Sequence, residues 1–282
     1  MQLIRESEVS IPRPVTTFKH SPVSSIIMGG IFAVIAIGMA FMIIRGEFPV
    51  FMWAAVGVLL LMDMIVISTI LAARKPSNWL MKTDGKNLAI KFRSYLNGHF
   101  PAEDLTVVTL ATDEIQSMCK TVERKNMPGS KNDGGSTSTD WSTWTYFDIK
   151  MNENADLNVL REATKHERLA EAPQEGKTRT SYHHRPVRVV GPDTIRLAWK
   201  SGPDKIQPKV GAVLKAFGDS ISIGPENKIK QPHWHELEGD AFSDYLIDLC
   251  ESGKGSKAER AARIHFNLDS KAAREFIEKL AG

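Results

Sequence analysis

Two apolar runs near the N-terminus constrain the fold more than any other feature of this chain. Val23–Ile44 and Val50–Ala73 contain one ionisable residue between them, Asp63. Each run exceeds the roughly 20 residues that an α-helix needs to cross a bilayer core of about 30 Å. Only Arg-Gly-Glu-Phe-Pro at 45–49 separates them, so a chain that crosses must return at once. Because soluble helices that are apolar on every face are rare, the sequence predicts a transmembrane hairpin over 23–73.

The leading run differs from a cleaved signal peptide. Such a peptide has an apolar core of about 7–15 residues that ends in a small-residue cleavage site. Here the run is longer, begins only at Val23 and is followed at once by a second run. We therefore expect both runs to remain in the protein as two spans.

The flanking basic residues predict the orientation, because Lys and Arg favour the cytoplasmic side. They lie outside the two runs, at Arg5, Arg13, Lys19, Arg74, Lys75, Lys82 and Lys86. The connection carries only Arg45, which Glu47 offsets. Cys119 and Cys250 are the two cysteines and form no C-x-x-C pair, as expected in a reducing compartment. We expect an integral protein of a bacterial inner (plasma) membrane with both termini in the cytoplasm.

Charge argues for lipid partners rather than nucleic acid. The formal net charge of +3 is too small to indicate nucleic-acid binding by itself. Arg74 and Lys75 directly follow the second run, where each would contribute about 1 kcal/mol of attraction to anionic headgroups. Membrane lipids are therefore one expected partner.

Asp63 is expected to make a polar contact within the membrane. An ionisable residue at mid-bilayer costs roughly 2.5–3.5 kcal/mol, and the first run contains no Lys or Arg to pair with it. Three explanations remain: a protonated carboxyl bonded across a helix interface, an ion path that also needs an oligomer, or local water. Gly29, Ala33, Ala36 and Ala40 mark a small-residue face of the first run, suited to a hairpin or dimer contact.

Residues 76–224 have the pattern of an antiparallel β-domain. Short alternating or apolar runs predict strands over 79–83, 88–92, 105–110, 114–122, 146–151, 187–190 and 194–199, with a short last strand at 221–223. Asp84-Gly85 between two of them is a hairpin signal. Helices are expected over 156–170 and 205–217, and a Gly- and Ser-rich loop over 128–140. We expect one closed or strongly bent sheet.

The tail, residues 239–282, predicts three short amphipathic helices. Phe242, Tyr245, Leu246 and Leu249 form an apolar stripe at helical spacing. Because so small a unit rarely folds alone, we expect it to dock on the β-domain or to oligomerise. The plan is therefore an N-terminal cytoplasmic segment (1–22), the hairpin (23–44 and 50–73), the β-domain and this helical module.

Two strings of basic or imidazole side chains are candidate ligand sites. Alternation in His233–His235 would place two imidazoles on one face, as a metal requires, but no further ligands complete the set. We expect a structural or surface role there, with no metal and no cofactor. A second group suits phosphate or a lipid headgroup, with a solvated loop as the alternative. Its members are Arg179, His183, His184, Arg185 and Arg188.

The chain carries no catalytic signature. Asp104, Glu114 and Lys120 resemble the acid–acid–lysine set of metal-dependent nucleases, but such sites need an acid and a lysine one residue apart on one strand face. G-x-S-x-G, H-E-x-x-H and a Gly-rich loop ending in Lys-Ser or Lys-Thr are missing from the sequence. The sequence predicts no enzyme. A membrane-bound nuclease or lipid-acting hydrolase, and a small pore organised around Asp63, are the alternatives.

One stretch resembles a known family. The hairpin at 79–92, followed by Phe-Pro-Ala-Glu-Asp-Leu-Thr-Val-Val at 100–108 and a long strand, resembles bacterial two-span proteins with a cytoplasmic pleckstrin-homology-like domain. The resemblance covers 76–224 and implies a half-open β-barrel that a helix closes and that binds lipid, peptide or assembly partners. The helix expected at 156–170 departs from this pattern. The resulting hypothesis is an α+β membrane protein that acts as an anchored binding or scaffold protein, recognises proteins or lipids and forms a homo-oligomer.

Overall fold

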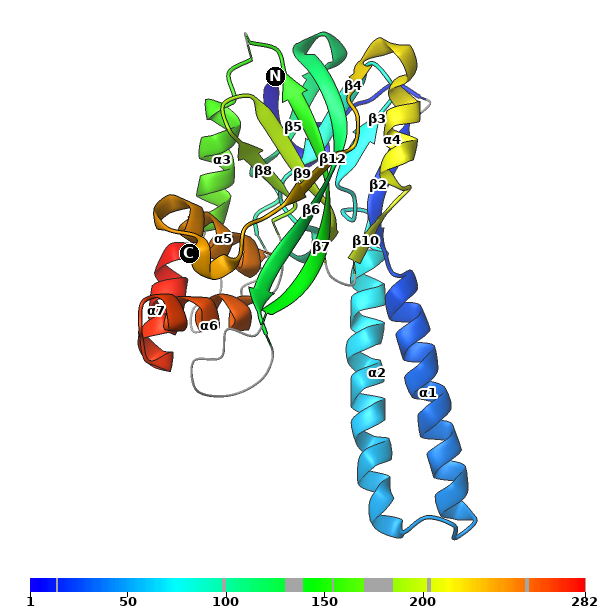
Figure 1. The fold of residues 1–282 in the computed structure, drawn as a ribbon. Coiled ribbons are helices and arrows are strands. Elements are labelled where there is room, and N and C mark those ends of the chain that lie inside the picture. Colours follow the sequence, from blue (N-terminus) through cyan, green and yellow to red (C-terminus); the bar gives the residue numbers. More distant parts are fainter. Residues whose placement is uncertain are drawn as a thin grey trace.

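The computed structural model describes residues 1–13, 15–97, 100–129, 139–153, 155–169, 185–201, 204–251 and 254–281. Most of the expected loop at 128–140 lies outside these residues. Arg179, His183 and His184 also lie outside them. The chain is α+β: two long helices project from a β-rich body that carries further helices (Figure 1).

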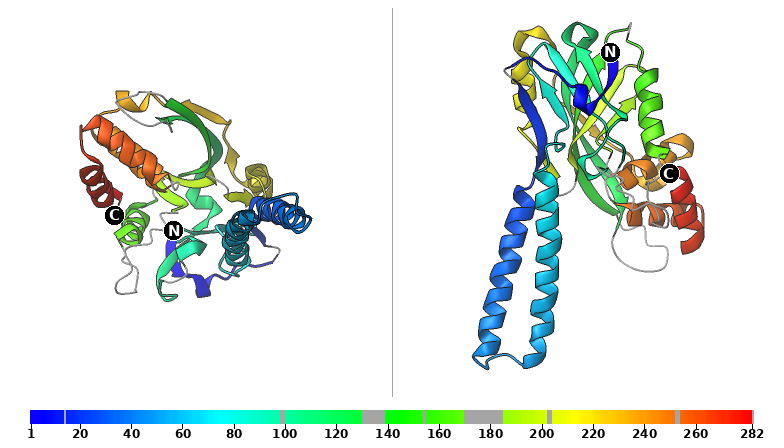
Figure 2. Two further views of the ribbon diagram at one scale, coloured as in Figure 1. Left: turned by 90° about the horizontal axis from the view of Figure 1, so that it is seen from below. Right: turned by 180° about the vertical axis from the view of Figure 1, so that it is seen from behind.

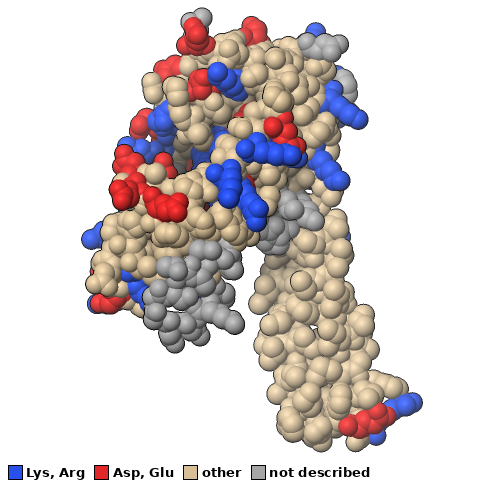
Figure 3. Space-filling model, in the orientation of Figure 1, with Lys and Arg blue, Asp and Glu red and all other residues tan. Residues whose placement is uncertain are grey.

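The two apolar runs form a stalk, defined here as α1 (Val23–Ile44) and α2 (Trp53–Ala73) with their connection. Both helices are long and apolar enough to cross a membrane, and only 11% and 6% of their most apolar stretches are buried. Figure 3 shows a stalk surface almost free of charge, with acidic and basic side chains at its tip. The predicted helices are therefore confirmed, and their apolar side chains are open to the surroundings.

The stalk is inserted between two neighbouring strands. β2 (Thr16–Ser21) leads into α1, and β3 (Met81–Thr83) follows α2. The two strands pair antiparallel, with Phe18 opposite Met81. Both ends of the stalk therefore leave the same sheet on the same side (Figure 2).

The N-terminal residues belong to the sheet, which corrects the expectation that 1–22 is a separate segment. β1 (Gln2–Arg5) pairs with β5 (Leu105–Ala111), and β2 pairs with both β3 and β10 (Asp204–Gln207). Strands this short have too few alternating residues to be recognised locally, and partners far along the chain fix them.

The strands form one continuous path in the described residues. The order is β1-β5-β4-β3-β2-β10-β9-β7-β6-β11, with β8 paired to β9 and β12 paired to β6. The remaining strands are β4 (Asn87–Lys91), β6 (Ile115–Pro128), β7 (Thr139–Met151), β8 (Val187–Val190), β9 (Thr194–Ser201), β11 (Ser222–Ile223) and β12 (Asn227–Lys230). Pairing is antiparallel except that β11 and β12 run parallel to β6.

The helix expected over 205–217 is shorter than predicted. Residues 204–207 form β10, and α4 occupies Val210–Phe217. Pro208 has no backbone N–H and disfavours helical geometry in the residue before it, so the helix begins after it. The helix expected at 156–170 is α3 (Asn158–Leu169), and Asp156 accepts a bond of 2.9 Å from the Asn158 N–H at its start.

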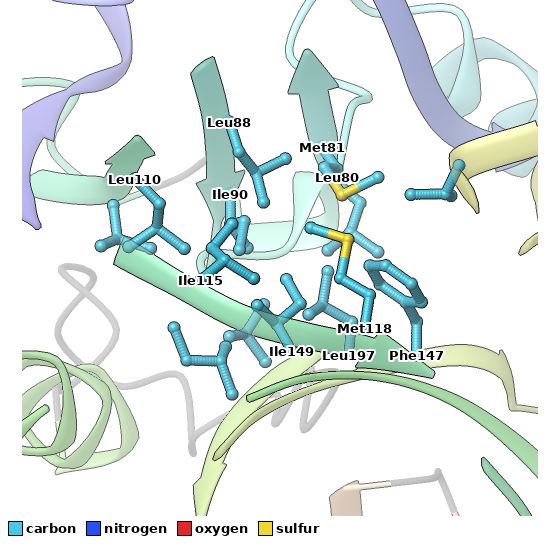
Figure 4. Close-up of a cluster of buried hydrophobic side chains, with 14 of the residues drawn as sticks. Leu80, Met81, Leu88, Ile90, Leu110, Ile115, Met118, Phe147, Ile149 and Leu197 are labelled. Atoms are coloured by element: carbon cyan, nitrogen blue, oxygen red, sulfur yellow. The ribbon is translucent and has the colours of Figure 1, made fainter. Parts of the chain in front are cut away.

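The two halves of the strand path face each other across the main core (Figure 4). Leu80, Met81, Leu88, Ile90 and Leu110 come from one half. Ile115, Met118, Phe147, Ile149 and Leu197 come from the other half. Leu160 of α3 and Val213 of α4 are also fully buried in this cluster, so both helices complete the core.

The C-terminal helices dock on the outer face of the sheet, as expected. α5 (Gly239–Glu251), α6 (Gly255–His265) and α7 (Ser270–Ala281) form the C-terminal module. Their apolar faces share a second core with Trp144 and Tyr146 of β7. Trp234, just before α5, is almost completely buried there and anchors the module.

Candidate functional site

Asp63 lies on the contact face between the two stalk helices. It is ten residues from either end of α2. A Cβ added to Gly29 of α1 would lie 3.6 Å from Asp63 Oδ1 and 3.0 Å from Val66 Cγ1. Ala36, on the predicted small-residue face, is buried in the same contact. The absence of a side chain at Gly29 therefore leaves room for the Asp63 carboxyl between the helices.

The stalk joins the β-rich body through Asn78. Its side-chain amide donates to the carbonyls of Ala73 and His20, the latter at 2.9 Å, and its oxygen accepts the His20 N–H at 3.2 Å. This side chain thus ends α2 and holds it against β2. Arg74 and Lys75, predicted to contact headgroups, are exposed immediately beside this junction.

The predicted basic cluster around residues 179–188 cannot be assembled from the described residues. Arg179, His183 and His184 lie outside them. Arg185 is described as half-buried, and Arg188 pairs with Asp248 instead. The prediction of an anion contact there stays a prediction.

The densest charged group in the described residues is a buried ion network between the sheet and the C-terminal module. It consists of Glu123 and Lys125 on β6, Asp148 on β7, Arg188 on β8, Arg196 on β9 and Asp248 on α5. Alternation brings the strand residues to the outer face, opposite the main core. We call this set the ion network.

Arg196 is the centre of the ion network. Its guanidinium donates two bonds of 2.7 Å to the two carboxylate oxygens of Asp148 and a third bond to Glu123. Thr121 donates to Asp148 at 2.7 Å. The Arg196 guanidinium also lies 4.9 Å from the centre of the Tyr146 ring, close enough for a cation–π contact.

Asp248 carries the network across to the helices. It forms ion pairs with Lys125 and with Arg188, and Lys125 also lies 3.1 Å from Glu123. Three acids face three bases, so the network is neutral when all six groups are charged. One carboxylate of α5 therefore fixes the module to two strands.

Burial and the neighbouring charges act in opposite directions on this network. Burial alone would raise the pKa of Glu123, but Lys125 and Arg196 outweigh it and hold that pKa below its usual value. Burial would lower the pKa of Arg196, whereas its bonds to Asp148 raise it. Glu123 and Arg196 are thus held in their charged forms, and the network acts as a structural joint.

The acid–acid–lysine set considered from the sequence is not assembled. Asp104 binds Arg93 at 2.5 Å, Glu114 binds the Met1 ammonium group, and Lys120 binds Glu226 at 2.8 Å. Each of the three residues thus binds a different partner, so the three do not meet at one site.

The ion network contains an acid and a lysine one residue apart on one strand face, which is the spacing that the acid–acid–lysine set lacks. The sequence analysis did not identify this network. Glu123 and Lys125 are one residue apart on one face of β6, and Asp148 lies on the neighbouring strand. Arg196, however, binds both carboxylates, so a divalent cation bound between them would have to displace a buried guanidinium. The arrangement is that of an ion-paired joint.

The two imidazole rings of the His233–His235 string lie close together, but no further metal ligands of the described residues surround them. The two imidazole centres lie 5.3 Å apart, and the residue between them in the sequence is the buried Trp234. In the part of the chain that the structure describes, no group of three or more His, Cys, Asp or Glu could hold a metal ion. Trp234 gives the string a structural role as the module's anchor.

Lys254, between α5 and α6, has an apolar environment. Its Nζ lies 3.2 Å from Ser142 Oγ and 4.7 Å from the centre of the Trp144 ring. The Nζ atom of Lys125 also lies near this ring, 4.5 Å from its centre. Burial, with a smaller effect of Lys257 and Lys125, lowers the pKa of Lys254 to about 8.

A cavity of about 800 Å³ lies under the N-terminal arm, between residues 1–11 and strands β4 and β5. Glu8, Asp113 and Glu114 are the acids that line it. Glu114 already binds the Met1 ammonium group and accepts the Ala111 N–H at 2.9 Å, so its carboxylate serves to hold the arm in place.

Comparison with known proteins gives no relative for this chain. No protein-family model, no curated protein and no solved structure matches it.

Proposed function

We propose that this chain is an integral membrane protein whose two helices cross a bacterial inner membrane and hold both termini in the cytoplasm. Its soluble part would bind protein or lipid partners at the membrane surface and act as a self-associating scaffold, without covalent chemistry. The observation that carries the proposal is the exposed apolar stalk, which leaves the sheet between two paired strands.

The energy of exposing the stalk supports a bilayer around it. In the described residues, the large apolar side chains that are exposed lie in the stalk, except for Leu105, Val159, Ile223 and Phe266. Burying one such side chain fully is worth about 1.5–3 kcal/mol, and whole domains are stable by only about 5–15 kcal/mol. Exposure of many such side chains to water would therefore cost free energy comparable to the stability of a whole domain. A hydrocarbon core around the stalk removes this cost.

The position of the stalk supports the same-side topology. β2 and β3 pair directly, so residues 21 and 81 lie on one side of any bilayer that the stalk crosses. The basic residues beside these strands favour the cytoplasm for that side. The tip offers only Arg45, offset by Glu47.

Binding without chemistry is supported by the state of the charged groups. The ion network is self-neutralised and joins the module to the sheet, leaving its carboxylates engaged. The resemblance of residues 76–224 to pleckstrin-homology-like domains would assign recognition to the β-rich body. The stalk would raise the local concentration of this body near membrane partners.

Cysteine labelling tests the topology. Cys119 is replaced by Ser and the buried Cys250 is kept. One accessible cysteine is then placed either at Glu47, at the tip, or at Lys228, whose side chain is 79% exposed on the body. In intact cells an impermeant maleimide should label the tip cysteine and reach the second site only after the inner membrane is opened. The reverse pattern, or full-length chain in a detergent-free ultracentrifuged supernatant, contradicts the proposal.

Native mass spectrometry of the full chain in nanodiscs tests the scaffold function. We expect a defined oligomer that Asp63→Leu disturbs, because the leucine removes the polar group from the helix contact. A fragment starting at residue 76 is unsuitable, since it lacks β1 and β2. A strictly monomeric chain contradicts self-association, and stoichiometric metal after chelator-free purification favours the enzyme alternative.

A further inference from the structure

We propose that the body makes a second contact with the bilayer, through an aromatic and basic patch that binds anionic phospholipid headgroups. This hairpin patch consists of Arg124 on β6, Trp141 on β7, and Lys228 and Lys230 on β12. The inference rests on the proposed function, because it needs a stalk that spans the membrane.

The patch is built around the Trp141 ring. The Arg124 guanidinium lies 5.0 Å from the ring centre and the Lys230 ammonium lies 5.4 Å from it. Arg124 and Lys230 are partners in the parallel register of β6 and β12. Trp141 is half-buried, and the edge of the His233 ring packs on it at 5.4 Å. The ring therefore holds two cations on one surface.

Arg124 and Lys230 are free to bind an anionic ligand because no carboxylate of the described residues pairs with them. Arg124 and Lys230 are exposed, and no ion pair between either of them and a described carboxylate is recorded. Glu226, just before β12, binds Lys120 at 2.8 Å and lies 4.0 Å from Lys228. Because Glu226 is paired with Lys120, the three bases of the patch leave an excess of positive charge along β12 and the facing part of β6.

The patch lies at the membrane end of the body. β6 runs toward its end at Pro128 and β7 starts at Thr139, and these ends reach the level at which α1 and α2 leave the body (Figures 1 and 2). Figure 3 shows Lys and Arg gathered over β6 and β12, beside the notch between the body and the stalk. The ribbon views thus place the free end of this hairpin at the level where the stalk leaves the body.

Interfacial chemistry favours lipid as the occupant. Tryptophan is enriched at the headgroup level of membranes, and each nearby Lys or Arg strengthens attraction to an anionic surface by about fivefold. β12 is flanked by Pro225 and Pro232 and carries two lysines, features that discourage a further strand from pairing with it. Charge, aromatic ring and position thus converge on an anionic bilayer surface.

A spin-label experiment on the full chain tests the contact. Cys119 is replaced by Ser and a nitroxide is attached at Thr143→Cys, an exposed position on β7 two residues from Trp141. The protein is placed in nanodiscs of phosphatidylcholine alone or with phosphatidylglycerol added. We expect collisions with an aqueous nickel complex to fall severalfold when the anionic lipid is present and to recover at high salt.

Charge reversal supplies the matched comparison. Arg124→Glu with Lys230→Glu should abolish the lipid-dependent protection, whereas Lys215→Glu, on the exposed face of α4, should leave it intact. The salt response of the unmodified patch tests the idea even if the double variant fails to fold. Equal accessibility in both lipid mixtures overturns the inference.

Two further outcomes separate the alternatives. Protection by an oligonucleotide in phosphatidylcholine nanodiscs, with none from phosphatidylglycerol, would assign the patch to nucleic acid and overturn the lipid reading. A chain that inserts its stalk without lipid-dependent protection refutes only this inference. A chain that does not insert refutes the proposed function as well.

Discussion

Arg196 is the side chain whose loss should destabilise the body most, because two buried carboxylates depend on it. The side chains of Glu123 and Asp148 are only 3% and 8% exposed, and Arg196 binds both. Arg196→Met keeps most of the apolar length and removes the charge, which leaves the network with one uncompensated negative charge. Removing one partner of a buried ion pair costs about 3–5 kcal/mol, and we expect a loss in that range.

Denaturant unfolding of the detergent-solubilised full chain, followed by tryptophan fluorescence, measures this loss. The pH dependence gives a second signature. In the intact protein the pKa of Glu123 is lowered from 4.5, so its contribution is present above that value and lost as pH falls through the folded pKa. In Arg196→Met, Glu123 loses one of the cations that lower its pKa and would take up a proton more readily, so the deficit should shrink as the pH falls.

Two matched variants decide whether the network acts as a unit. Adding Asp148→Asn to Arg196→Met restores the charge balance and should recover a large part of the lost stability. Lys120→Met breaks the exposed pair with Glu226, 37% and 39% exposed, and should leave the stability nearly unchanged because water screens this pair. If Arg196→Met matched this small effect, or if the double variant were no better than the single one, the coupled network would be refuted.

Three further outcomes are expected. Asp248→Asn should release the C-terminal module, so that limited proteolysis cuts near residue 239 at least about tenfold faster, whereas Asp244→Asn on the exposed face of α5 should not. Gly29→Ile should destabilise the stalk by about 1–3 kcal/mol in thermal melts in detergent, because even a Cβ there crowds α2. Gly38→Ile, in the same helix with open space around it, should leave the melt unchanged. Lys254, with a pKa lowered from 10.5 to about 8, should react with amine reagents near pH 8 faster than the exposed lysines of α7 by mass spectrometry. Its contribution to stability should rise with pH between these two values, and equal labelling would contradict its buried environment.

Local features of the sequence predicted the stalk and the C-terminal helices. The apolar runs match α1 and α2 because hydrophobic length is a property of the run itself. The start of α7 was also predictable from a local residue, because Asp269 caps the helix by accepting the Ala272 N–H at 2.7 Å. The Asp84-Gly85 turn also lies between two paired strands, with φ of 89° at Gly85.

Features that depend on distant partners escaped prediction. β1, β2 and β10 are short strands that take their structure from neighbours across the sheet, so residues 204–207 were mistaken for the start of a helix. The Glu123-x-Lys125 spacing was readable in the sequence, but nothing local pointed to Asp148 or Arg196 as its companions.

The sequence alone determined that this chain has two helices long and apolar enough to cross a membrane, with basic residues flanking them. Only the tertiary structure decided that the stalk interrupts a sheet, and that six distant charges meet beneath one helix. The reason is physical: apolar length is written along the chain, whereas charge pairing depends on which strands come together and in which register.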